Sequence, residues 1–127
     1  MAKRQTDKSA RKLTVRMYRD ILGDCFLIRA PQGDGTINVL IDCGILQGMP
    51  GAAERAGRIM RDVADTTSKH LDVLIVTHEH WDHLSGFEQA KDIFADIEVS
   101  ELWLGWTEDP RDELAQKLSD GRAKALV

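Results

Sequence analysis

The chain has 127 residues, 43% of them hydrophobic and 30% charged, with a formal net charge of −4 at pH 7. This length predicts one small domain or part of a larger one, and the apolar fraction is sufficient for a core. No run approaches the ~18 apolar residues that a membrane helix needs, and the N-terminus lacks the apolar stretch of a secretory signal; together these features predict a cytoplasmic protein without a membrane partner.

The charges are unevenly distributed along the chain. Residues 1–12 hold five basic residues and one acidic residue, a net charge of +4, whereas the remainder has 12 basic and 20 acidic residues, a net charge of −8. We expect residues 1–12 to form a disordered basic leader, with contact to phosphates as the alternative. The domain is then expected to span residues 13–127. Its acidic balance argues against a broad nucleic-acid surface, although nucleic acid stays open as a partner.

The first half of the domain is predicted to contain strands followed by a helix. Alternating apolar and polar residues predict a half-buried strand at 13–19, and the apolar runs at 25–30 and 37–41 predict a hairpin around a Pro-Gln-Gly-Asp-Gly turn. Cys25 and Cys43 flank this hairpin and are expected to face each other as buried thiols without a disulfide. An amphipathic helix is predicted over residues 52–63; its arginines are interpreted as a solvated face, with a phosphate-binding patch as the alternative.

The second half is predicted to alternate strands and helices. Residues 71–76 form a short apolar run that predicts a buried strand. Apolar residues at helical spacing between Leu84 and Ile97 predict a helix, and residues 99–105 predict another strand. Trp103 and Trp106 are expected to pack in the core, with a substrate pocket as the alternative. The pair Asp109-Pro110 predicts the start of a last helix.

Residues 77–86 read Thr-His-Glu-His-Trp-Asp-His-Leu-Ser-Gly and hold three of the four histidines of the chain. They follow a predicted strand, at the end where open α/β sheets keep their chemistry. His78 and His80 are two residues apart, so on an extended backbone their rings point to the same side. Asp82 and His83 follow where the chain turns, and Ser85 is interpreted as a cap or helix-start residue. Imidazole and carboxylate suit zinc and similar divalent ions, so the segment predicts a metal site; a chance cluster in a polar loop is the alternative.

The pattern His78-x-His80-x-Asp82-His83 after an apolar strand resembles the signature of the metallo-β-lactamase-fold hydrolases. Thr77 before it and Leu-Ser-Gly after it also fit. Residues 39–44 (Val-Leu-Ile-Asp-Cys-Gly) are similar to the family's earlier strand that ends in an aspartate, and residues 23–28 are similar to the strand before it, especially in members related to DNA-uptake competence proteins. The resemblance covers about residues 13–105.

The resemblance implies an α/β fold, the first half of an αββα sandwich in which a mixed sheet is flanked by helices. It implies two divalent ions, zinc with manganese or iron as alternatives, one held by His78 and His80 and the other by Asp82 and His83. A metal-bound hydroxide would attack an ester, amide or phosphodiester, and Asp82 would also be catalytic by orienting it or passing its proton to the leaving group. Thr77 and Asp42 would hold the ligand loop in place; for Asp42 a strand-end turn or cap is an equal alternative.

Members of the family bring further ligands, two histidines and a bridging aspartate, from the second half of the domain, and residues 84–127 contain no histidine. We therefore expect an apparently truncated half of a metallo-hydrolase that is inactive by itself. The alternative is a non-catalytic half-domain or a module completed by another chain. The substrate, a small molecule or a phosphodiester, is left open. Continuous apolar strands also predict an uncovered inner sheet face and self-association through it.

Overall fold

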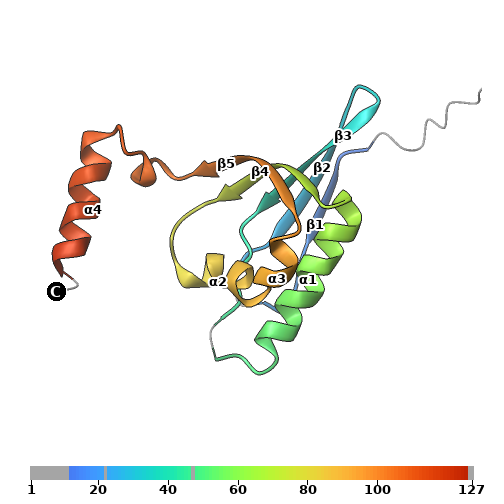
Figure 1. The fold of residues 1–127 in the computed structure, drawn as a ribbon, viewed down its shortest axis with the longest axis horizontal. Coiled ribbons are helices and arrows are strands. Elements are labelled where there is room, and N and C mark those ends of the chain that lie inside the picture. The colour runs from blue at the N-terminus through green and yellow to red at the C-terminus, as the bar shows by residue number, and fades with distance from the viewer. Residues whose placement is uncertain (1–11, 22, 47, 126–127) are drawn as a thin grey trace, which may run out of the picture.

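Figure 1 shows the chain as a computed structural model, which describes residues 12–21, 23–46 and 48–125. Of the predicted leader at residues 1–12, all but Lys12 lies outside the described residues. In chain order the elements are β1 (Thr14–Met17), β2 (Phe26–Gln32), β3 (Gly35–Ile41), α1 (Ala52–Thr67), β4 (His70–Val76), α2 (Trp81–Gln89), α3 (Lys91–Phe94), β5 (Glu98–Leu104), η2 (Trp106–Glu108) and α4 (Glu113–Ala125).

The five strands form one sheet in the order β1-β2-β3-β4-β5. Strands β1, β2 and β3 pair in antiparallel fashion, whereas β3, β4 and β5 pair in parallel. Parallel neighbours need a crossover connection, which α1 provides between β3 and β4, and α2 with α3 between β4 and β5. The predicted α/β class and the mixed sheet are confirmed.

Helices α1, α2 and α3 lie together on one side of the sheet (Figure 1). The apolar stripe of α1 is buried in the core cluster that also holds apolar side chains of the strands, among them Leu27, Leu40 and Leu71. On the opposite face of α1, Arg58 pairs with Glu54 one turn earlier at 2.8 Å, and both side chains are exposed, as the predicted solvated face requires. Within the described ranges, no helix is both long and apolar enough to span a membrane.

The β2–β3 hairpin has a tighter turn than the sequence predicted. The strands continue to Gln32 and resume at Gly35, which leaves a two-residue turn whose first residue, Gly33, has a φ of 55°. Glycine adopts this left-handed conformation without a steric penalty. Pro31 was expected to lie in the turn, yet it pairs with Thr36 inside the hairpin. Its missing N–H is tolerated because the β1–β2 pairing ends at Arg29, so β2 needs no donor on that side.

The helix predicted between Leu84 and Ile97 is divided in the structure. α2 ends at Gln89, α3 ends at Phe94, and Ala90 between them has a non-helical φ of −115°. The rings of Phe87 and Phe94 contact each other across the break, with centroids 4.8 Å apart. The apolar spacing reflects packing, because Phe87, Ile93 and Phe94 all contact the core cluster. A single non-helical residue between two helices leaves no trace in such a pattern.

Two predictions at the C-terminal end are wrong. The helix begins at Glu113 and not at Pro110, because Asp112 is the residue whose Oδ1 accepts the backbone N–H groups of Leu114 and Ala115, each at 2.9 Å. The tryptophans are not in the core: Trp103 is 54% exposed and Trp106 is 57% exposed. β5 is the edge strand of the sheet, and all of its residues except Val99 are exposed.

The sheet face opposite α1 is apolar. The strand register aligns one residue of each strand into a row across the whole sheet: Met17, Phe26, Ile41, Ile75 and Trp103. A second row beside it contains Val15, Ile28, Val39 and Val73. At the outer strands these side chains are more than half exposed, and the central ones are only partly buried. The two rows are called the open face below.

Candidate metal centre

The four predicted ligands lie between β4 and α2. His78 and His80 are on the connecting loop and are exposed, whereas Asp82 and His83 lie in the first turn of α2 and are partly buried. His80 is the residue that precedes the helix, and its backbone is extended, with φ −64° and ψ 142°. The end of a parallel strand and the start of the next helix thus bring all four side chains to one edge of the sheet.

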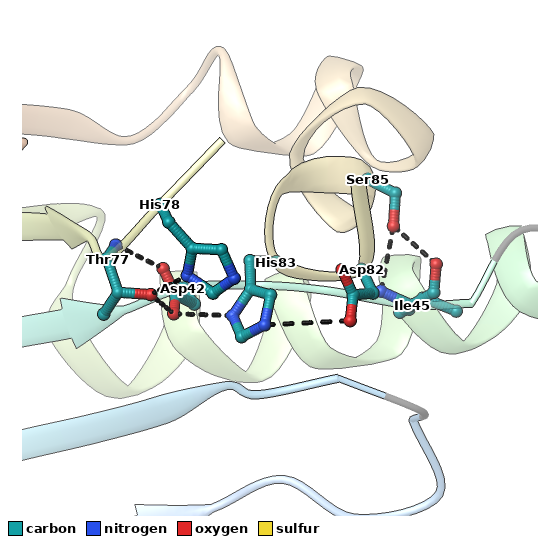
Figure 2. Close-up of polar contacts among 7 residues, drawn as sticks. All are labelled: Asp42, Ile45, Thr77, His78, Asp82, His83 and Ser85. Carbon is teal, nitrogen blue, oxygen red and sulfur yellow. Dashed lines mark hydrogen bonds and ion pairs between the residues drawn. The ribbon is translucent and has the colours of Figure 1, made fainter. Parts of the chain in front are cut away.

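Asp42, directly after β3, lies between Thr77 and His83 and contacts both (Figure 2). Its side chain is buried, with only 1% of the residue exposed. Oδ1 accepts the backbone N–H of Thr77 at 2.8 Å, and Oδ2 accepts the Thr77 hydroxyl at 2.6 Å and lies 3.0 Å from Nδ1 of His83. The carboxylate therefore has three donors, which satisfies a buried charge. Its φ of 52° is left-handed, a conformation that aspartate tolerates better than most residues.

The hydrogen bonds around Asp42 decide which ring nitrogens carry protons. An ionised carboxylate only accepts, so Nδ1 of His83 must donate to it, which leaves Nε2 of a neutral His83 with a free lone pair. The single hydroxyl proton of Thr77 is also directed to Asp42. The 2.9 Å contact between Thr77 Oγ1 and His78 Nδ1 therefore needs the proton on His78 Nδ1, and Nε2 of His78 is likewise unprotonated. One buried carboxylate is thus linked to both imidazoles, directly to His83 and through Thr77 to His78.

Asp82 is the carboxylate closest to the free nitrogen of His83. Its Oδ2 lies 3.7 Å from His83 Nε2, and its side chain is 48% exposed. Two ligands bound about 2.1 Å from a tetrahedral zinc ion are about 3.4 Å apart. The separation of the two atoms is thus close to what a shared ion requires.

His78 lies between the other two histidines. Its ring centroid is 4.7 Å from that of His80 and 3.8 Å from that of His83. The prediction that the rings of His78 and His80 lie on the same side of the loop agrees with this short distance. The contact between His78 and His83 joins the two predicted ligand pairs into one cluster of rings.

The start of α2 is bonded to the segment that follows β3 and not only to β4. The backbone N–H of Cys43 donates to the carbonyl of His83 at 2.9 Å, and Gly86 donates to the carbonyl of Cys43 at 2.8 Å. Ser85 was interpreted as a cap or helix-start residue, which is wrong because it lies inside α2. Its buried hydroxyl instead accepts the N–H of Ile45 at 2.9 Å and donates to the Ile45 carbonyl at 2.5 Å.

Glycine is required where these backbones touch. A Cβ built on Gly44 would lie 1.3 Å from the carbonyl oxygen of Asp82, and one on Gly23 would lie 2.0 Å from the same atom. A Cβ on Gly86 would meet Sγ of Cys43 at 2.4 Å. The role of Gly44 was not recognised in the sequence, where a glycine after an aspartate and a cysteine also reads as an ordinary turn.

Cys25 and Cys43 are free, buried thiols, as predicted. A hydrogen bond to Cys43 and burial raise the pKa of the Cys25 thiol far above its ordinary value. A thiol in this state is a poor nucleophile and a poor metal ligand. The cysteines therefore belong to the packing under the centre and not to its chemistry.

The residues fit zinc by type but do not enclose an ion by themselves. Imidazole nitrogens with free lone pairs and an exposed carboxylate are suitable donors. In the described part of the chain, however, no three His, Cys, Asp or Glu side chains converge in a geometry that could hold a metal ion. A catalytic zinc usually takes three protein ligands. The roles of His78, His80, Asp82 and His83 as ligands therefore stay predictions.

Comparison with known proteins adds a family. A family model described as the metallo-beta-lactamase superfamily matches residues 18–117. The matched range contains β2 to β5, Asp42 and the whole segment from Thr77 to Gly86. Neither the curated proteins nor the solved structures give a match. Because the matched range covers well over half of the 127 residues, the chain belongs to the metallo-beta-lactamase superfamily.

Proposed function

We propose that the chain carries part of the active centre of a metal-dependent hydrolase that cleaves an ester, amide or phosphodiester bond. The observation that supports this most directly is the network around Asp42, which leaves Nε2 of both His78 and His83 free to bind a cation. His78 and His80 would hold one divalent ion, and Asp82 with His83 would hold a second. Zinc suits these donors best, and manganese or iron would also be accepted.

A divalent ion bound here would supply Lewis-acid polarisation of the scissile bond and a water whose pKa falls to about 7. The chain's own residues supply the rest. Asp42 orients His83 directly and His78 through Thr77, so both rings are positioned before any substrate arrives. Asp82, whose side chain is 48% exposed, would orient the attacking water, accept its proton at Oδ2 and pass that proton to the leaving group.

A second candidate is a non-catalytic module that is completed by another chain. The observation that favours it is the lack of a converged group of three ligands among the described residues. In both candidates the 127 residues alone are expected to be inactive. In the first candidate, additional ligands would come from outside the described ranges. The two candidates differ in whether any metal binds through the histidines.

Calorimetric titration with zinc tests the proposal. We expect weak binding that is abolished in the double variant His78→Ala/His80→Ala. His70→Ala is the matched control, because His70 lies at the first residue of β4, away from the loop. Equal zinc binding by the double variant and the control would refute the metal centre. Tight binding of two ions per chain would instead show that the ligand set is complete within these residues.

Hydrolysis assays test the expected inactivity of the chain by itself. We expect no metal-dependent turnover of a phosphodiester, a carboxylic ester or a β-lactam by this chain alone. Turnover that is lost in the Asp82→Ala variant would show that the chain is active by itself and would contradict the expected inactivity. Contaminating hydrolases are excluded by that variant, purified in the same way.

A further inference from the structure

Glu79 stands between the two histidines of the loop, and its side chain is bound by a residue from α4. On extended backbone, successive side chains point to opposite sides. A partner that fixes Glu79 therefore also fixes the direction in which His78 and His80 point. That partner is Arg122: its Nη1 pairs with Oε1 of Glu79, and its Nη2 lies 3.5 Å from Oε1 of Glu108 in η2. These three residues, Glu79, Arg122 and Glu108, are called the clasp below.

The helix that carries Arg122 is attached at its start to the residues that precede it. Its first turn is capped by Asp112, Ala115 is only 2% exposed, and the side-chain amide of Gln116 donates to the carbonyl of Pro110. In Figure 1, α4 lies apart from the sheet, beyond β5 and η2. These contacts join the start of α4 to the residues just before it, and Arg122, near the end of the helix, pairs with Glu79 on the loop after β4.

Packing does not hold Glu79 in place. A cavity of about 160 Å³ lies beside the loop, with apolar walls from Val76, Leu84 and Leu104. His78 and both carboxylate residues of the clasp also line this cavity. The side chain of Glu79 is 52% exposed, and it faces the guanidinium of Arg122. The backbone on either side has its own contacts, since the His80 carbonyl accepts the N–H of His83 at 2.9 Å and His78 Nδ1 lies 2.9 Å from Thr77 Oγ1. The ion pair with Arg122 is the contact that acts on the Glu79 side chain itself.

We propose that Arg122 is a positioning residue of the metal centre, which orders His78 and His80 by binding the glutamate between them. Asp42 anchors the loop at Thr77 and the helix at His83, and the clasp restrains the residues between these two anchors. The effect on metal binding rests on the function proposed above, whereas the effect on loop order does not. Arg122 touches no predicted ligand and is not assigned a chemical step.

The first experiment measures loop order without metal. In the Arg122→Gln variant, the backbone order parameters of Glu79 and His80 from ¹⁵N relaxation should fall from near 0.85 toward 0.6. Arg111→Gln is the matched control, because Arg111 is an exposed arginine that pairs only locally, with Asp109 at 3.0 Å. Unchanged order parameters in Arg122→Gln would overturn the inference, whatever the metal does.

The second experiment uses zinc alone. We expect about three- to fivefold weaker binding in Arg122→Gln, the scale of one exposed ion pair, and no change in Arg111→Gln. The double variant Glu79→Gln/Arg122→Gln should be no weaker than either single variant, and Arg122→Lys should recover only part of the loss because it lacks the planar fork that spans two carboxylates. Raising the salt from 0.05 to 0.5 M should weaken the wild type toward the variant.

The outcomes separate the two proposals. A wild type that binds no zinc, yet loses loop order in Arg122→Gln, refutes the metal centre and supports the clasp. If the wild type binds zinc and the Arg122→Gln variant binds it with equal affinity at low salt, the metal centre is supported and the clasp is overturned. Additive losses in the double variant would likewise overturn it, because independent effects show that Glu79 and Arg122 do not act together.

Discussion

Nδ1 of His83 lies 3.0 Å from Oδ2 of Asp42, a residue that precedes it by 41 positions. The imidazole is 14% exposed and the carboxylate 2%, so the bond is shielded from water. Hydrogen bonds to a charged group are stronger than those between neutral groups, and this carboxylate also accepts two donors from Thr77. The orientation of the ligand loop should therefore depend on a residue outside it.

Replacing Asp42 with asparagine should test this dependence. The amide nitrogen cannot accept, so at least one of the three donors loses its partner, at a cost of about 2–4 kcal/mol in the free energy of unfolding. Asparagine tolerates the left-handed backbone, which keeps the change local. Zinc affinity should fall by roughly 10- to 100-fold. Urea unfolding and calorimetry measure both effects; the exposed control Asp65→Asn should stay within about 0.5 kcal/mol. An Asp42→Asn protein as stable as this control would contradict the network.

Gly44→Ala should be strongly destabilising. The added Cβ would overlap the carbonyl oxygen of Asp82, and neither backbone can move without breaking the bonds between Cys43 and α2. We expect a loss of about 3 kcal/mol or more in urea unfolding. Gly121→Ala is the opposite control, because its Cβ meets open space in α4. It should raise the free energy of unfolding by about 0.5–1 kcal/mol. Equal stability of the two variants would mean that the two segments are not in contact.

The buried thiols give a prediction about pH. The raised pKa of Cys25 means that the fold favours the neutral thiol. This contribution to stability is present below the ordinary thiol pKa and is lost as the pH rises above it. Alkylation by iodoacetamide at pH 8 should be at least ~100-fold slower in the native protein than in urea, since it requires opening of the fold. Rapid native alkylation that increases from pH 7 to 9 would show an accessible thiol of ordinary pKa.

The open face predicts association of the chain on its own. Contiguous apolar patches larger than a few hundred Å² are rare on soluble monomers. We expect light scattering to show self-association and a hydrophobic dye to bind. Met17→Glu places a charge in the row at an exposed position and should reduce both signals, whereas Leu118→Glu on α4 removes an exposed apolar side chain elsewhere and should not. A monodisperse, dye-free wild type would refute this prediction.

The sequence predicted elements whose pattern reflects local burial. The strand at 71–76, the amphipathic stripe of α1 and the position of the histidine loop follow from periodicity and from the order of apolar runs. The break at Ala90 and the N-cap at Asp112 were missed, because Asp109-Pro110 offers an equally good local start signal. The exposure of Trp103 was missed because burial of an edge strand depends on what covers the sheet, which no local pattern records.

The site was predictable in its residue types and not in its connections. Four potential ligands in six residues are visible in any reading of the chain. The bond between Asp42 and His83 was expected only in outline from the family resemblance, and the pairing of Arg122 with Glu79 was not expected at all. Both join residues more than 40 positions apart, and sequence spacing carries no information about such contacts.

Strand β3 has an antiparallel neighbour on one side and a parallel neighbour on the other, and this arrangement orders the assembly of the site during folding. The β2–β3 hairpin closes through two residues, whereas the pairing of β3 with β4 must first close a loop that contains α1. Because longer loops cost more entropy to close, we expect the parallel half of the sheet to join after the hairpin. Asp42 is carried by the hairpin and His83 by the later half, so a chain arrested before the β3–β4 pairing would have its hairpin but no ligand loop held in place.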